Sequence, residues 1–145
     1  MKVLFVCVAN VGRSQMAEAF FNQVSAHKAT SAGVAVGDRE GQTLGDRAKE
    51  PEASSTPGNM LKIMKEEEGL DLYRKVRKQL TPHMADEADK VVVICRGDPC
   101  PDYLENNPKV TFWNIQDLYG TPYESVRQLK DEVKQHVERL VSQIG

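Results

Sequence analysis

Cys7, Arg13 and Ser14 have a spacing that suits covalent chemistry on an anion. Cys7 follows a short apolar run, and Arg13 and Ser14 come after five intervening residues that include Gly12. A thiolate is a strong nucleophile where positive charge surrounds it. An arginine can donate two parallel hydrogen bonds to an oxyanion, and a serine hydroxyl can donate to the thiolate. The spacing therefore predicts a nucleophile beside a site for a tetrahedral oxyanion.

The residues after Cys7 are expected to bind that anion through their backbone. Residues 2–7 are predicted to form a buried strand, and residues from about 12 to 26 a helix. Ligands of open α/β sheets bind beyond the carboxyl ends of strands, and helix N-termini attract anions. Gly12 permits the backbone torsions of a tight loop, and Asn10 can hold that loop in shape. The expected oxyanion site comprises Val8, Ala9, Asn10, Val11, Gly12, Arg13 and Ser14.

A chance occurrence of Cys-x5-Arg is the alternative. In that case Cys7 would be a buried core thiol and Arg13 a surface charge. The placement of the motif between a predicted strand and a predicted helix, with Ser14 following, favours the functional interpretation.

The rest of the chain is expected to alternate between strands and helices. Strands are expected at residues 2–7, 29–33, 91–94 and 110–113, and helices at about 12–26, 57–68, 82–88 and 123–144. Residues 34–56 are the most loop-like stretch. Such alternation predicts a parallel sheet with helices on both faces.

Two groups of charged residues stand out from this pattern. Glu66, Glu67 and Glu68 crowd the C-terminal end of the predicted helix 57–68, where the helix dipole disfavours negative charge. The other group is a basic cluster that we expect to be a solvated face rather than an anion-steering site. It consists of Arg74, Lys75, Arg77 and Lys78.

Length and composition restrict the possible classes of protein. A chain of 145 residues fits a single catalytic domain, 1–145. Its net charge of -2 gives no overall field for nucleic acid or membranes, so neither is an expected partner. The apolar run at residues 1–6 is too short for a signal peptide or a membrane span. We therefore expect a cytoplasmic location.

Cys95 and Cys100 bring the cysteine count to three. A reducing compartment argues against a structural disulfide framework, which leaves buried thiols or thiol chemistry. Cys95 follows an apolar strand, and glycine and proline between the two cysteines let the loop bend. A zinc site is an alternative, but His83 and His136 have no ligand-like spacing to the cysteines. No metal or cofactor is expected.

Residues 7–20, CVANVGRSQMAEAF, resemble the low-molecular-weight protein tyrosine phosphatase superfamily. The run RSQMAEA is most similar to its thioredoxin-coupled arsenate reductase branch. The likeness continues through residues 31–33, 69–71, 80–82 and 88–93 and into Trp113 and Asp117. It implies an α/β three-layer sandwich with a central four-stranded parallel sheet, like that of the low-molecular-weight phosphotyrosine phosphatases, in which Cys7 is the nucleophile and Arg13 clamps the anion.

The resemblance also implies an activity, the reduction of arsenate to arsenite. Cys7 would attack arsenate, and Cys95 and Cys100 would pass a disulfide to thioredoxin or another thiol reductant. Hydrolysis of small phosphomonoesters would be a side activity. The cysteine pair of the resembled reductases has a longer intervening segment, so the short loop 95–100 limits how far Cys95 can travel toward Cys7.

Asp117 is the candidate general acid for hydrolysis, since it follows the last predicted strand. The family carries an Asp-Pro there, whereas Leu118 replaces the proline in this chain. A solvated turn aspartate is the alternative for Asp117. For the whole chain, one alternative is a low-molecular-weight tyrosine phosphatase with redox-protective cysteines. A non-catalytic phosphate- or phosphoprotein-binding module is another, although binding alone needs no nucleophile.

Overall fold

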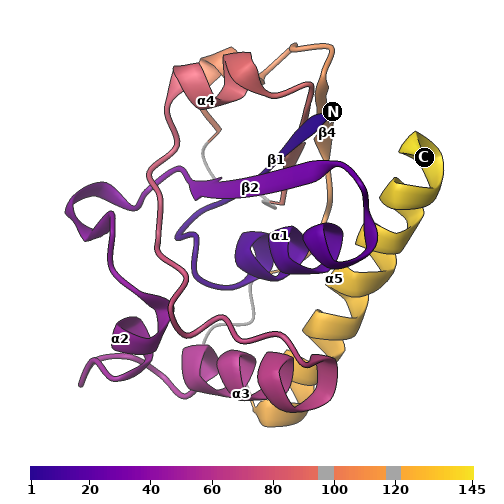
Figure 1. Ribbon diagram of the computed structural model, residues 1–145. Helices are drawn as coiled ribbons and strands as arrows, with labels where there is room; N and C mark the ends of the chain where they lie inside the picture. Colours follow the sequence, from indigo (N-terminus) through magenta and orange to yellow (C-terminus); the bar gives the residue numbers. More distant parts are fainter. Residues whose placement is uncertain (95–99, 117–121) are drawn as a thin grey trace.

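The computed structural model describes residues 1–94, 100–116 and 122–145 (Figure 1). Four parallel strands form one sheet in the order β2-β1-β3-β4. They are β1 (Lys2–Cys7), β2 (Lys28–Gly33), β3 (Lys90–Val93) and β4 (Val110–Phe112). The register pairs Cys7 with Gly33, so the carboxyl ends of β1 and β2 meet at one edge of the sheet. The expected four-stranded parallel sheet is confirmed.

Helices cover the two faces of this sheet. They are α1 (Arg13–Val24), α2 (Leu44–Ala48), α3 (Thr56–Glu68), α4 (Pro82–Glu87) and α5 (Tyr123–Ile144), with short 3-10 turns η1 (Gly37–Arg39) and η2 (Asp102–Leu104). The helices α1, α3 and α5 share a core cluster with one face, and α4 and η2 share a second cluster with the other. The fold is therefore the expected three-layer α/β arrangement (Figure 1).

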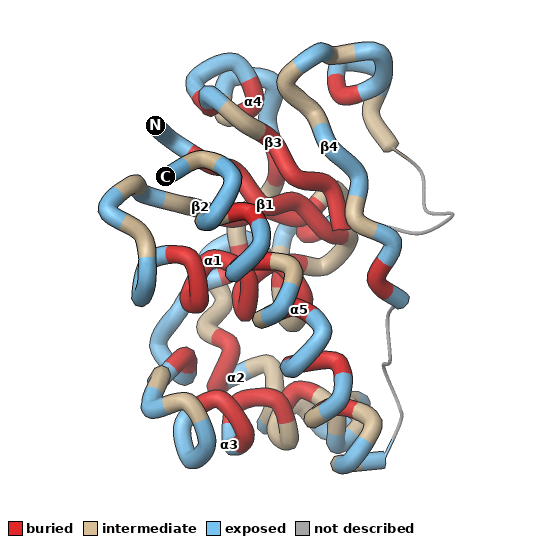
Figure 2. Tube along the Cα trace, turned by 90° about the vertical axis from the view of Figure 1, so that its right-hand side faces the viewer, coloured by how far each residue is buried: buried red, intermediate tan, exposed pale blue. Residues whose placement is uncertain are grey.

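Alternation along β1 explains the two clusters. Val3 and Phe5 contribute to the first cluster, and Leu4 and Val6 to the second, because successive strand residues face opposite sides of a sheet. Figure 2 shows β1 and β3 largely buried, whereas the edge strand β4 is exposed. Phe5 also packs edge-to-face against Phe21 of α1, with ring centroids 5.9 Å apart.

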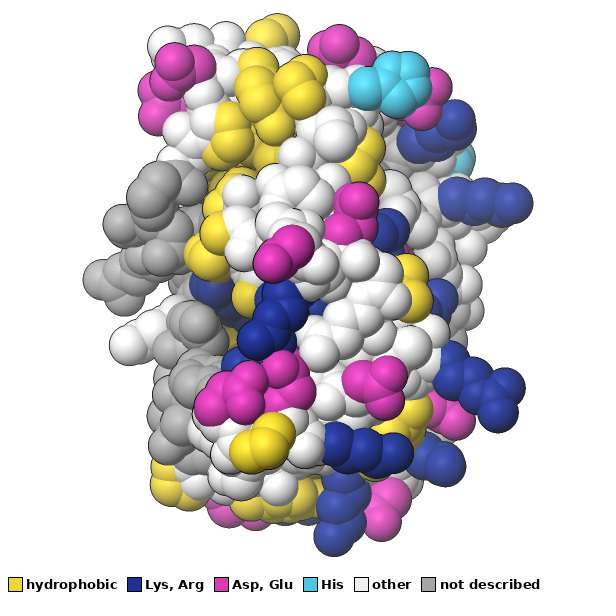
Figure 3. Space-filling view, turned by 90° about the vertical axis from the view of Figure 1, so that its left-hand side faces the viewer, with side chains coloured by type: hydrophobic (Ala, Val, Ile, Leu, Met, Phe, Trp, Pro, Cys, Tyr) yellow, Lys and Arg dark blue, Asp and Glu magenta, His cyan; other side chains and the backbone are white. Residues whose placement is uncertain are grey.

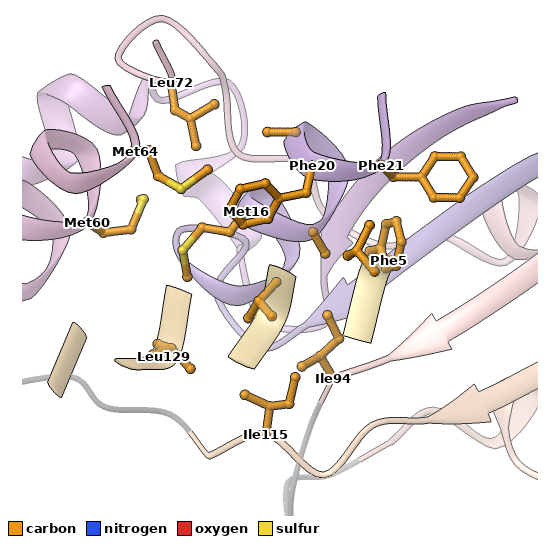
Figure 4. Packing of buried hydrophobic residues seen from close by; sticks show 14 of the residues in the cluster. Phe5, Met16, Phe20, Phe21, Met60, Met64, Leu72, Ile94, Ile115 and Leu129 are labelled. Carbon is orange, nitrogen blue, oxygen red and sulfur yellow. The ribbon is translucent and has the colours of Figure 1, made fainter. Parts of the chain in front are cut away.

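Side chains of α1 and α3 meet in the first cluster. Met16 and Phe20 of α1 point toward Met60 and Met64 of α3 (Figure 4). All four are at most 2% exposed. Methionine side chains are flexible and fill irregular gaps between packed helices. This packing links α3 to α1 through the first core cluster.

The long connection, residues 34–56, is more ordered than the sequence predicts. It contains η1 and α2, so the expectation of an extended loop is wrong in part. Thr43 is the N-cap of α2, and its side-chain oxygen accepts a hydrogen bond from Asp46 N at 3.1 Å. Threonine with an acidic residue three positions later is a helix-start signal that the sequence contained.

The acidic end of α3 is compensated by cations of α5. Lys130 Nζ lies 2.9 Å from Glu68 Oε2, and Lys134 Nζ lies 2.7 Å from Glu68 Oε1. Arg127 donates to Glu67 Oε2 at 2.6 Å. The side chain of Lys130 is only 5% exposed, so this network is a partly buried link between two helices. It explains how Glu67 and Glu68 can lie at the C-terminal end of α3.

Burial and pairing oppose each other at the centre of this network. Burial would lower the pKa of Lys130, but hydrogen bonds to Asp131 and Glu68 outweigh it and raise the pKa above its ordinary 10.5. Burial would raise the pKa of Glu68, but Lys134 and Lys130 outweigh it and hold the pKa below its ordinary 4.5. The Glu68 contribution to stability is therefore complete above pH 4.5 and disappears as the pH falls through its lower folded value. The Lys130 contribution is complete below pH 10.5 and disappears as the pH rises through its raised folded value.

The substitution Glu68→Gln should lower the free energy of unfolding by about 2 kcal/mol at neutral pH, because Lys130 and Lys134 each lose a charged acceptor. Urea denaturation measures this loss, and the difference from the unsubstituted protein should shrink as the pH falls well below 4.5. Glu66→Gln is the matched control, since Glu66 is exposed on the same helix. Equal stabilities of the two variants at neutral pH would contradict the prediction.

Candidate active site

The backbone of β2 supports the loop that follows Cys7. Val34 N donates to Cys7 O at 3.0 Å, directly after the last paired residues of β1 and β2. A Cβ atom at Gly33 would lie 2.6 Å from Val8 O and 2.8 Å from Asn10 N, closer than real contacts allow. Glycine is therefore required at this position, and the strand itself forms the floor of the loop.

The Cys7 thiol is buried, at 2% exposure, and has two hydrogen-bonding neighbours. Cys7 Sγ lies 2.8 Å from Ser14 Oγ, and Asn10 N donates to it at 3.3 Å. Ser14 Oγ accepts from Asn10 Nδ2 at 2.9 Å, which leaves the serine proton available for sulfur. The Cys7 sulfur thus lies within hydrogen-bonding distance of a side-chain hydroxyl and a backbone N–H.

Asn10 ties the loop to neighbouring segments. It adopts a positive φ of 55°, a conformation that asparagine tolerates better than most residues. Its Nδ2 donates to Ser31 Oγ at 3.0 Å, and its Oδ1 accepts from Lys78 N at 2.8 Å. Gln15 Nε2 donates to the same Oδ1 at 3.0 Å. The side-chain amide of Asn10 thus both donates and accepts hydrogen bonds.

Arg13 begins α1 and lies beside the thiol. It is 5% exposed, and its Nη1 donates to Ile115 O at 2.9 Å. Gly12 is the N-cap of α1 and supplies no side-chain cap. Backbone N–H groups of the first helical turn, together with a guanidinium, attract an anion at such an end.

A cavity of about 90 Å³ joins Cys7, Arg13 and Arg47. Its other described lining residues are Ala9, Val11, Gly12, Met16, Thr56, Pro57, Met60, Val126 and Leu129. The volume is far below the roughly 300–1,000 Å³ typical of sites for drug-sized ligands and suits an inorganic oxyanion. Hollows of about 620 and 610 Å³ lie elsewhere, and the lining of neither includes Cys7 or Arg13.

Arg47 belongs to α2, inside the stretch that the sequence marked as loop-like. Its Nη1 lies 3.3 Å from Glu50 Oε1, which also accepts from Gln42 Nε2 at 2.9 Å and from Arg39 Nη1 at 2.5 Å. The hydrogen bond from Gln42, opposed by burial and assisted by Arg39, lowers the pKa of Glu50 to about 2. Glu50 is therefore ionised at neutral pH and holds Arg47 near the cavity. On the face drawn in Figure 3, basic side chains gather around a hollow with acidic side chains next to them.

The basic cluster 74–78 is only partly the solvated face that we expected. Arg74 and Lys75 are exposed, whereas Arg77 is 6% exposed and donates from Nε to Ala9 O at 3.1 Å. Lys78 is partly buried, and its backbone N–H bonds to the loop as described above. The expectation is therefore wrong for Arg77 and Lys78. Helical or strand periodicity cannot reveal a contact between residues 68 positions apart.

Two of the expected catalytic residues, Asp117 and Cys95, lie outside the described residues. Cys100 is described as a free, partly buried cysteine packed against the second core cluster. Burial, with a smaller effect of the Glu105 charge, raises the pKa of Cys100 and favours its neutral thiol. Cys100 is not among the described lining residues of the Cys7 cavity. The structure thus groups Cys7 with Arg13 and the anion loop, and places Cys100 in a different environment.

Comparison with known proteins decides the family. The family model for low molecular weight phosphotyrosine protein phosphatase matches residues 2–145. The chain belongs to this phosphatase family. The resemblance carried by residues 7–20 is therefore confirmed, and the strand, loop and helix around Cys7 lie within the matched range.

Relatives within the phosphatase family include reductases. The glutaredoxin arsenate reductase of Synechocystis sp. is 30% identical over 147 residues, which cover 99% of this chain and 98% of that protein. A solved arsenate reductase in the phosphate binding state is 28% identical, with a TM-score of 0.76 and 99% and 98% of the two chains covered. The low molecular weight protein tyrosine phosphatase from T. tengcongensis is 26% identical, with a TM-score of 0.76 and 99% of each chain covered. The chain is thus an enzyme of a family that includes both reductases and phosphatases.

The described segments contain neither a cluster of metal-ligating side chains nor a helix suited to span a membrane. Across residues 1–94, 100–116 and 122–145, no group of three or more His, Cys, Asp or Glu side chains is placed to hold a metal ion. Within the same segments, no helix is long and apolar enough to cross a bilayer. The expectation that the enzyme needs no metal or cofactor stays a prediction.

Proposed function

We propose that this chain is a single-domain arsenate reductase of the cytoplasm, with hydrolysis of small phosphomonoesters as a side activity. The observation that carries the proposal is the cavity of about 90 Å³ at Cys7, sized for a free oxyanion and flanked by Arg13 and Arg47. Support also comes from the Synechocystis relative, which is named as a glutaredoxin arsenate reductase. Cys95 and Cys100 provide the thiols that reduction requires.

The proposed reaction is a sequence of thiol exchanges. The Cys7 thiolate attacks arsenic(V), and one arsenate oxygen leaves as water. Cys95 then attacks Cys7 Sγ, the sulfur–arsenic bond breaks with its electron pair on arsenic, and arsenite departs. Cys100 then attacks the Cys95 sulfur of the Cys7–Cys95 disulfide, which releases the Cys7 thiolate and forms the Cys95–Cys100 disulfide. A dithiol protein, thioredoxin or glutaredoxin, finally reduces the Cys95–Cys100 disulfide.

Residues around Cys7 have distinct roles in this proposal. Ser14 and the Asn10 N–H stabilise the thiolate before attack and after its release. Arg13 and the first turn of α1 bind the oxyanion and orient it toward Cys7 Sγ. Arsenic(V) accepts two electrons from thiols, whereas phosphorus(V) does not. The same pocket therefore reduces arsenate but only hydrolyses a phosphate ester, with Asp117 as the proton donor to the leaving group.

A tyrosine phosphatase is the second candidate function. The likeness to the T. tengcongensis phosphatase favours it, as does the apolar wall that Met60, Val126 and Leu129 give to the cavity. In that case Cys95 and Cys100 would protect Cys7 from oxidation and take no part in turnover. A non-catalytic binding module is less well supported, because it would not need a buried thiol with two donors.

A coupled assay tests the proposal directly. The protein is mixed with arsenate, NADPH and either thioredoxin with its reductase or glutaredoxin with glutathione and its reductase. Arsenate-dependent loss of NADPH in either system, proportional to protein concentration, is the expected result. Hydrolysis of an aryl phosphate with no arsenate-dependent NADPH loss in both systems would favour the phosphatase instead.

A further inference from the structure

The segment 76–79 runs against the anion loop and is held by its own backbone. Gly33 N donates to Lys78 O at 2.8 Å, and Gly41 N donates to Arg77 O at 2.8 Å. Arg77 N in turn donates to Gln42 O at 2.9 Å. The backbone of Arg77 is therefore positioned independently of its side chain, which makes side-chain substitutions informative.

The Arg77 guanidinium is buried without a carboxylate partner in the described part of the chain. Its acceptors among the described residues are two neutral oxygens, Ala9 O at 3.1 Å and Gln42 Oε1 at 2.9 Å. Burial lowers the pKa of Arg77, and the nearby Arg47 and Arg39 lower it further. The charges of Glu50 and Cys7 act in the opposite direction. A buried cation is costly unless negative charge lies close, and a Cys7 thiolate supplies such charge.

The contact with Ala9 also determines where the next N–H points. The peptide between Ala9 and Asn10 is trans, so its C=O and N–H point in opposite directions. Arg77 holds the carbonyl on one side. On the other side, Asn10 N donates to Cys7 Sγ at 3.3 Å. The guanidinium therefore fixes the orientation of a peptide that hydrogen-bonds the nucleophile.

We propose that Arg77 is a positioning residue for the Cys7 thiolate. It aims the Asn10 N–H at the sulfur, and its charge stabilises the thiolate electrostatically. Arg77 acts through the peptide and needs no contact with the substrate. The inference rests on the proposed role of Cys7 as the nucleophile, and it holds for both the reductase and the phosphatase reaction.

Other charges also face Cys7 and set the background for this effect. Arg13 of α1 and Arg47 of α2 line the same cavity, and Glu50 pairs with Arg47. Behind the loop, Glu18 accepts from Ser31 Oγ at 3.0 Å and lies 3.8 Å from Lys78 Nζ. The described lining residues of α3 and α5 carry no charge. Loss of Arg77 therefore removes one of several cations and should shift thiolate formation without preventing it.

Titration of a single thiol tests the inference without any substrate. All proteins carry Cys95→Ser and Cys100→Ser, so that Cys7 is the sole remaining thiol of the three. Ultraviolet absorbance of the thiolate and the rate of alkylation by iodoacetamide are followed against pH. With Arg77→Ala, the midpoint of thiolate formation should rise by about one pH unit, which means about tenfold slower alkylation below the midpoint.

Arg74→Ala is the matched control, because Arg74 is an exposed arginine three residues before Arg77. It should leave the midpoint unchanged. A folded Arg77→Ala protein with the unsubstituted midpoint overturns the inference, whatever its activity. If Arg77→Ala does not fold, Arg77→Gln decides: a raised midpoint supports the inference and an unchanged one overturns it. Because no arsenate is present, failure of the proposed function cannot be mistaken for failure of this inference.

Discussion

A Cys7→Ser protein should neither reduce arsenate nor hydrolyse aryl phosphates, with both rates falling by at least about 10⁴-fold. A serine hydroxyl ionises far less readily than a thiol, and it cannot form the disulfide on which reduction depends. The pocket around Ser14, Asn10 and Arg13 should remain, since serine is smaller than cysteine and can accept the same hydrogen bonds. The loss would therefore lie in chemistry rather than in anion binding.

Two measurements separate these effects for the Cys7 variant. Initial rates of NADPH oxidation and of p-nitrophenol release report the two reactions. Isothermal titration with inorganic phosphate reports the anion site, and its affinity should stay within about threefold of the unsubstituted protein if α1 still supplies the donors. Retention of either reaction at more than a trace would show that Cys7 is not the nucleophile.

Replacing Cys95 or Cys100 should separate reduction from hydrolysis. With Cys95→Ser the thiol–arsenate adduct at Cys7 has no partner thiol, so catalytic release of arsenite should stop. With Cys100→Ser the reaction should end after no more than about one arsenite per protein molecule, leaving a Cys7–Cys95 disulfide. Hydrolysis of an aryl phosphate should stay within about twofold in both variants, because it needs only the nucleophile, the anion site and the general acid.

Arsenite yield per protein molecule, together with the mass of peptides linked by disulfides, checks this second prediction. The raised pKa of Cys100 adds a kinetic expectation, since a neutral thiol attacks slowly. Resolution by Cys100 should therefore accelerate as the pH rises. Repeated turnover by the Cys95→Ser protein would exclude the relay and leave the cysteines with a protective role.

Local pattern was sufficient to predict the elements that carry the nucleophile. Three predicted elements correspond to β1, α1 and α5, with each boundary within about two residues. They are the apolar run 2–7, the helical spacing after Gly12 and the repeat in 123–144. These signals are local, because each depends on residues a few positions apart. The family also followed from a contiguous stretch, residues 7–20.

Contacts between distant residues account for what the sequence did not predict. Arg77 meets Ala9 across 68 positions, and Glu68 meets Lys130 across 62. From the sequence alone, a charged residue such as Arg77 or Lys130 is expected to be exposed, because none of its sequence neighbours indicates that it is buried. The sequence also did not predict that Arg47 lies at the site. Arg47 belongs to the five-residue helix α2, and the helix-start signal at Thr43 is weak among the glycine and charged residues that surround it. The sequence-based predictions were therefore wrong mainly about which charged side chains are buried and which residues they contact.

The close approach of Gly33 to the anion loop has a consequence for the reaction cycle. The support beneath the loop is main chain, which has no proton to lose, no rotamer to change and no sulfur to oxidise. Each step of the proposed cycle alters the charge or bonding of a cysteine above that support. This part of the support therefore keeps its chemistry unchanged while the cysteines of the proposed cycle change theirs.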